Sequence, residues 1–141
     1  HMPLENLSNF EGEDEFVLRT SMNSKTLQDR LRAAFGQIPA AIGMNNHQGS
    51  KASADKHVMS NIARVLKDKD LFFIDSRTTA ETVAESTMEV FNVPTSRRNV
   101  FLDNESDENK IDEKNNYFCS RRSNFINCYI LSFQFDYEFW R

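Results

Sequence analysis

Polar residues that can take part in acid–base or metal chemistry follow three short apolar segments of the sequence. His47 follows the first segment, Asp75 and Arg77 follow the second, and Asp103 follows the third. Neutral imidazole binds zinc, and a carboxylate can accept a proton from water. If the three segments are parallel strands, their carboxyl ends share one edge of a sheet, where α/β domains gather their catalytic groups. The spacing therefore indicates a candidate catalytic or metal site.

Each of these residues also has a structural interpretation. A lone histidine such as His47 is often an exposed loop residue. Asp75 and Asp103 can each cap a following helix, and Arg77 can pair with a neighbouring acid. His57 falls inside a predicted helix, and we expect it to be solvated.

His1 lies before Met2-Pro3-Leu4-Glu5, at what we interpret as the end of a further, truncated strand. The dipeptide His1-Met2 also matches the scar that removal of a purification tag leaves behind. With His1 included, four strand ends face one cleft.

Helical and strand patterns alternate along the chain. Apolar residues at helical spacing predict a first helix capped by Asn23 or Ser24 and ending near Pro39, and a second capped by Ser53 or Asp55. A third helix is predicted to open at residues 76–79 and to stop before Pro94. The predicted strands cover residues 40–45, 71–75 and 99–103, and another helix is expected to begin within 107–114. This order predicts an α/β fold with a parallel sheet.

Composition limits the classes of partner. The chain has 141 residues and a formal net charge of -4, and its basic residues form no continuous face, so we expect no nucleic-acid binding. No apolar run approaches the roughly 20 residues that span a bilayer. Cys119 and Cys128 match no redox or zinc spacing, and we expect free thiols.

Residues 115–141 differ in character from the rest of the chain. They are rich in Phe, Tyr, Asn, Cys and Ser, and they lack the Gly and Pro residues that mark helix ends. Two interpretations stay open: out-of-frame translation of AT-rich DNA, which we favour, or an added edge strand.

Three blocks of the sequence together resemble the divergent polysaccharide deacetylases. They occur in that family's order and spacing, and the segment His1-Met2-Pro3-Leu4-Glu5 resembles another family segment, which favours native residues over a tag scar. The resemblance covers roughly residues 1–114, which we predict to be an incomplete deacetylase-like β/α domain. The three blocks are Ile42-Gly43-Met44-Asn45-Asn46-His47-Gln48-Gly49-Ser50, Leu71-Phe72-Phe73-Ile74-Asp75-Ser76-Arg77-Thr78-Thr79, and Val93-Pro94-Thr95 with Asn99-Val100-Phe101-Leu102-Asp103-Asn104.

The resemblance implies a partial parallel β/α barrel that hydrolyses the acetamide of an N-acetylated sugar or polysaccharide. A divalent metal, expected to be zinc, would activate water, and a carboxylate would accept the proton. His1 and His47 are the expected metal ligands. Asp75 and Arg77 are the expected catalytic residues that orient the ligands or the substrate. Asn46 and Asp103 are expected to form hydrogen bonds with sugar hydroxyls.

Two departures from the family pattern shape these expectations. The family begins with a strand that ends in paired aspartates and continues to a His-Pro strand end, and we expect this chain to lack both. The alternative function is therefore a non-catalytic carbohydrate- or envelope-binding remnant of the fold. The resemblance also implies a location in the cell envelope, the periplasm or outside the cell, although no export signal is visible in this chain.

Overall fold

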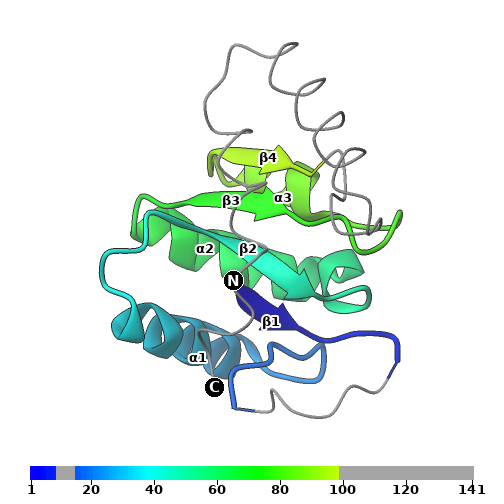
Figure 1. The fold of residues 1–141 in the computed structure, drawn as a ribbon, viewed down its shortest axis with the longest axis horizontal. Coiled ribbons are helices and arrows are strands. Elements are labelled where there is room, and N and C mark those ends of the chain that lie inside the picture. The colour runs from blue at the N-terminus through cyan, green and yellow to red at the C-terminus, as the bar shows by residue number, and fades with distance from the viewer. Residues whose placement is uncertain (9–14, 99–141) are drawn as a thin grey trace, which may run out of the picture. The chain divides into compact units, whose positions relative to one another are not determined.

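A four-stranded parallel sheet forms the centre of the chain in a computed structural model that describes residues 1–8 and 15–98 (Figure 1). The strand order follows the sequence, β1-β2-β3-β4, and every neighbouring pair is parallel. The strands are β1 (Met2–Leu4), β2 (Gly43–Gln48), β3 (Phe72–Asp75) and β4 (Thr95–Arg97).

Three α-helices connect the strands, and Figure 1 shows them on the same side of the sheet, as right-handed crossovers between successive parallel neighbours require. They are α1 (Ser24–Gln37), α2 (Lys56–Asp68) and α3 (Ala84–Val90), with a short 3-10 turn, η1 (Ala52–Ala54), before α2. The α/β class with parallel strands is thus confirmed. The described residues form an open sheet, and closure into a barrel stays a prediction.

Side-chain caps fix where the first two long helices begin. The Asn23 side chain accepts a hydrogen bond from the backbone N–H of Thr26, and the Asp55 side chain accepts one from Val58. Each cap satisfies an N–H group that the first helical turn leaves without a partner. The predicted starts of both helices are confirmed, with Asn23 and Asp55 as the caps.

The hydrophobic core lies between the sheet and the helices. Strand side chains alternate between faces, so Met44 and Phe73 point from β2 and β3 towards the helices, where both are buried. Helix α2 contributes most to this core because apolar residues at helical spacing cover one broad face; Val58, Ile62, Val65 and Leu66 are all at most 1% exposed.

Two predicted elements have other boundaries in the structure, and three further predictions lie outside the described residues. The strand predicted at residues 40–45 is Gly43–Gln48, so Asn46 and His47 lie inside a strand and not in a loop. The third helix begins at Ala84, because the side chain of Asp75 holds residues 76–83 in a loop. The strand predicted at 99–103, the helix expected within 107–114 and the 115–141 tail lie outside the described residues.

In the described part of the chain, no helix is both long and apolar enough to cross a bilayer.

Candidate functional site

The parallel pairing of β1 with β2 brings two histidines together. In this pairing Pro3 lies opposite His47, and His1 directly precedes β1. Nε2 of His1 lies 3.1 Å from Nδ1 of His47. The two rings are 4.8 Å apart between centroids and inclined at 62°. One nitrogen of each imidazole therefore faces the other across a short gap.

The separation of these nitrogens can be compared with the geometry of a zinc site. Zinc–nitrogen bonds of about 2.0–2.1 Å in a tetrahedral arrangement hold two nitrogen ligands about 3.3 Å apart. The 3.1 Å separation between His1 Nε2 and His47 Nδ1 is close to this value, and it is equally a hydrogen-bond distance between the two rings. A catalytic zinc takes three protein ligands, and within residues 1–8 and 15–98 no group of three or more His, Cys, Asp or Glu side chains is close enough to hold a metal.

Asp75 lies on the other face of the sheet. Residue Ile74 pairs with Asn45, and side chains in a parallel pair point to the same face when they are in register. His47, two residues after Asn45, therefore shares the face of Ile74, whereas Asp75 points towards the helices. The Asp75 carboxylate is 1% exposed and accepts hydrogen bonds of 2.8 Å from the Arg77 N–H and from the Thr82 hydroxyl. The structure does not bring this carboxylate to the histidine pair.

Asn46 is fully buried on the same face as Asp75. Its Nδ2 donates to the carbonyl of Gln48, and its Oδ1 accepts from the N–H of Ser76, both at 2.8 Å. The two ends of the amide thus hold the backbone of the last residue of β2 and of the first residue after β3.

Arg77 lies at the end of β3 with an exposed side chain and a left-handed backbone conformation, φ 47°. Its carbonyl accepts a hydrogen bond of 3.2 Å from the Arg98 guanidinium. Arg77 therefore stands at the carboxyl edge of the sheet, where it was expected. Asp103 lies outside the described residues.

Two residues next to the histidine pair were missed as site residues in the sequence. The Asn45 Nδ2 lies 3.4 Å from Nδ1 of His1 and donates, also at 3.4 Å, to the Ser76 hydroxyl. That hydroxyl donates to the carbonyl of Asn46 at 2.6 Å. The signal was present in the period-two alternation of strands, because Ser76 continues the face of Ile74 and Asn45, whereas its charged neighbour Asp75 does not.

The loop that follows β1 is tied to the turn that follows β2. The Asn6 Oδ1 accepts hydrogen bonds from the N–H groups of Gly49, at 2.8 Å, and Ser50, at 3.2 Å. Glu5 receives a 2.8 Å hydrogen bond from the Lys51 ammonium. Burial acts to raise the pKa of Glu5, but the hydrogen bonds from Lys51 and Thr20 outweigh it and hold the pKa below its ordinary value. Glu5 thus has a structural role as an ionised anchor.

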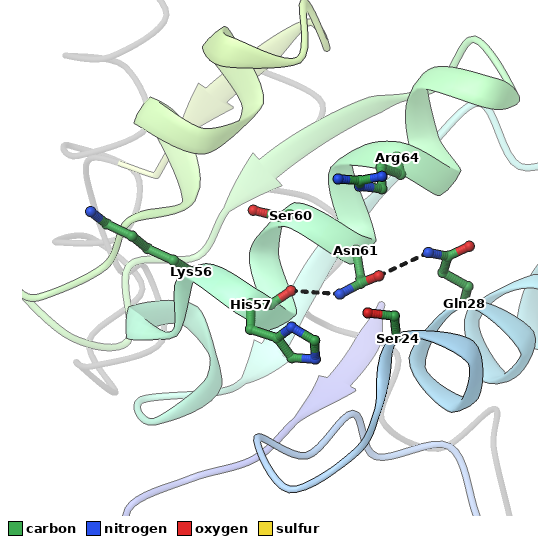
Figure 2. A pocket seen from close by; sticks show the side chains of 7 residues that line it. All are labelled: Ser24, Gln28, Lys56, His57, Ser60, Asn61 and Arg64. Atoms are coloured by element: carbon green, nitrogen blue, oxygen red, sulfur yellow. Dashed lines mark hydrogen bonds between the residues drawn. The ribbon is translucent and has the colours of Figure 1, made fainter.

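A hollow lies between α1 and α2, away from the histidine pair (Figure 2). Across it, Gln28 Nε2 of α1 donates to Asn61 Oδ1 of α2, and within α2 Asn61 Nδ2 donates to the His57 carbonyl, both at 2.8 Å. Figure 2 shows the Lys56 side chain extending away from this bonded pair. Nε2 of the His57 ring lies 3.2 Å from the carbonyl of Met22. We interpret the hollow as part of a polar contact between the packed helices α1 and α2.

Comparisons with known proteins identify the family. A sequence model of the family described as "Divergent polysaccharide deacetylase" matches residues 1–122. An uncharacterized protein of Haemophilus influenzae is 37% identical over 107 residues, which cover 76% of this chain and 38% of that protein. The uncharacterized protein YibQ of Escherichia coli is 32% identical over 108 residues, covering 77% of this chain and 34% of YibQ.

A solved structure has the same fold. The crystal structure of the uncharacterized protein ATU2773 from Agrobacterium tumefaciens superposes with a TM-score of 0.77 at 21% identity, over 86% of this chain and 51% of that one. The chain thus spans little more than a third of the length of these curated relatives and about half of the solved structure.

Proposed function

The chain belongs to the divergent polysaccharide deacetylase family, and on that premise we propose that it carries part of a metal-dependent site that removes acetyl groups from N-acetylated sugars or polysaccharide. The observation that carries the proposal is the approach of His1 Nε2 to within 3.1 Å of His47 Nδ1. We also propose, from the family alone, that the chain acts in the cell envelope or outside the cell.

The histidine pair supplies the ligands in this proposal. When bound, zinc provides a Lewis acid that polarises the acetamide carbonyl and makes water more acidic. His1 and His47 would hold it through the two facing nitrogens, because neutral imidazole is a preferred zinc ligand.

The other predicted site residues take different roles in the proposal, according to their exposure and their hydrogen bonds. Arg77 has an exposed side chain beside the strand ends, which suits it to orient a sugar or an acetamide oxygen. Asp75 is bonded to Arg77 N–H and Thr82 on the helix side of the sheet, so we assign it to holding the loop and not to proton transfer. Asn46 keeps its amide on backbone groups, and in the proposal it supports the strand ends. Asp103 remains a proposed contact for sugar hydroxyls.

A second function is favoured by the number of ligands. The described residues supply two imidazoles and no third metal-binding side chain close to them, which suits a module that binds carbohydrate without hydrolysing it. Such a module would bind glycan equally well in the presence of a chelator.

The test compares His47→Ala with His57→Ala in the 141-residue chain. Both variants lose one imidazole, but His57 lies on α2 against the carbonyl of Met22, away from the pair. We expect isothermal titration calorimetry to show zinc binding in the parent and in His57→Ala. Loss of one zinc ligand should weaken binding in His47→Ala by at least the roughly 10–100-fold typical of a lost supporting partner.

Hydrolysis is measured separately, as zinc-dependent acetate release from N-acetylglucosamine oligomers. Equal zinc affinity in the parent and in His47→Ala would contradict the assignment of the pair. Glycan binding that is insensitive to chelator, without acetate release, would support the binding module instead.

A further inference from the structure

The histidine pair is supported by side chains from the neighbouring strands. His1 approaches His47 on one side and the amide of Asn45 on the other, where Nδ2 lies 3.4 Å from His1 Nδ1. Asn45 in turn bonds to Ser76, which directly follows β3. Three parallel segments thus contribute one continuous set of polar interactions on the face of the sheet away from the helices.

The hydroxyl of Ser76 determines how the Asn45 amide is turned. Ser76 Oγ lies 2.6 Å from the carbonyl of Asn46, a short distance that identifies the hydroxyl as the donor, since a carbonyl can only accept. With its single proton used there, Ser76 can only accept from Asn45, so the Nδ2 group of that amide faces Ser76. The same Nδ2 faces His1.

The orientation of the amide then fixes the His1 ring. An amide nitrogen only donates, so Nδ1 of His1 is the acceptor, and the proton of the neutral ring lies on Nε2. Nε2 faces Nδ1 of His47 at 3.1 Å. The direction of every hydrogen bond from Ser76 to His47 follows from the first one.

We propose that Ser76 is a positioning residue that, through Asn45, fixes the orientation and tautomer of the His1 ring and thereby holds its Nε2 against His47. The positioning role itself does not depend on the function proposed above. Its benefit does rest on that function, because an imidazole held in one orientation is prepared to bind a metal. The proton that this tautomer places on Nε2 points at His47 Nδ1, and a metal bound between the two nitrogens would displace it.

Three variants of the 141-residue chain test this role. Ser76→Ala removes the hydroxyl, and Ser76→Thr retains it. The matched control is Ser86→Ala, which removes a hydroxyl that donates to the nearby Val83 carbonyl at the start of α3. Backbone amide spectra of all four proteins establish that the fold is retained.

The first readout is nuclear magnetic resonance of the metal-free chain at about pH 8.5, where free imidazoles are neutral. The parent, Ser76→Thr and Ser86→Ala should show nuclear Overhauser effects between the His1 and His47 rings, and ¹⁵N shifts of one His1 tautomer. In Ser76→Ala the Overhauser effects between the rings should disappear and the His1 shifts should average. Unchanged Overhauser effects and shifts in Ser76→Ala would overturn the proposal.

The second readout is zinc affinity by calorimetry, which we expect Ser76→Ala to weaken by about tenfold and the other two variants to leave unchanged. The two readouts separate the hypotheses. If no protein binds zinc, while the Overhauser effects between the rings vanish in Ser76→Ala alone, the metal-dependent function fails and Ser76 is still a positioning residue.

Discussion

The hydroxyl of Thr82 donates a 2.8 Å hydrogen bond to Oδ2 of Asp75, across the loop that joins β3 to α3. The other carboxylate oxygen accepts from the Arg77 N–H. A 1% exposed carboxylate is costly to bury unless hydrogen bonds compensate for the lost water. These bonds explain why an acidic residue at a strand end is tolerated without contact to the candidate site.

Thr82→Val should lower the free energy of unfolding by about 1–3 kcal/mol, because it leaves a buried acceptor of Asp75 without its donor. The matched control is Thr95→Val. Among the described residues, the Thr95 hydroxyl is buried without a hydrogen-bond partner, so its removal should be neutral or stabilising. Urea unfolding of both variants measures the difference, and equal effects would contradict the structural role of Asp75.

Gly49→Ala should destabilise the fold. Gly49 has φ +95°, a conformation that L side chains rarely adopt, and an added Cβ would lie 2.6 Å from the Cβ of Leu4 in β1. We expect a loss of about 1–3 kcal/mol from backbone strain and crowding together. Gly36→Ala in α1 is the control, since no atom lies within 4 Å of its added Cβ. That substitution should stabilise the helix by about 0.5–1 kcal/mol. Thermal melts of the two variants should therefore shift in opposite directions.

The free energy of unfolding should fall at acid pH, in part because Glu5 becomes protonated. Its pKa is lower in the folded chain than its ordinary value of 4.5, so the unfolded state binds more protons at pH values between the two. The stabilisation from Glu5 is therefore complete above the ordinary pKa and is lost as pH falls through the folded pKa.

Glu5→Gln should flatten this part of the stability–pH curve, measured by urea unfolding at a series of pH values from neutral down to about 3. Glu89→Gln on the exposed side of α3 is the control. A curve of the same slope in Glu5→Gln and the parent would show that the hydrogen bonds of Glu5 with Lys51 and Thr20 contribute nothing.

The sequence predicted the elements whose signals are local. Each of the first two helix starts was predicted to within two candidate caps, Asn23 or Ser24 and Ser53 or Asp55, because cap chemistry acts within one turn, and the structure selects Asn23 and Asp55. The continuous apolar run that ends at Asp75 correctly indicated a buried strand. These features depend on neighbours in the chain, and the α/β class follows from their alternation.

Features that depend on distant contacts could not be predicted in this way. The segment Thr95–Arg97 carries little strand signal, and it becomes β4 because its backbone pairs with β3. Asn46 and His47 looked like a polar loop, yet the pairing of β2 with β1 extends the strand through them. Apolar periodicity cannot identify a strand that is held by its partner's hydrogen bonds.

The candidate site was predicted only in part for a related reason. His1 and His47 were named together, and the structure brings them together. Asp75 was named by its charge and its place at a strand end, but the face of the sheet to which it points depends on register with β2. Ser76, uncharged and adjacent, falls on the face of the histidines.

The placement of Asp75 and Ser76 on opposite faces makes this part of the chain sensitive to changes in length. A substitution at either position alters one side chain, whereas deletion of one residue within Phe72–Asp75 would exchange the faces of everything that follows in the strand. The carboxylate would then point to the face of the histidines and the hydroxyl into the core. We therefore expect homologous sequences to accept insertions and deletions in the loop at residues 76–83 far more readily than in the strand that precedes it.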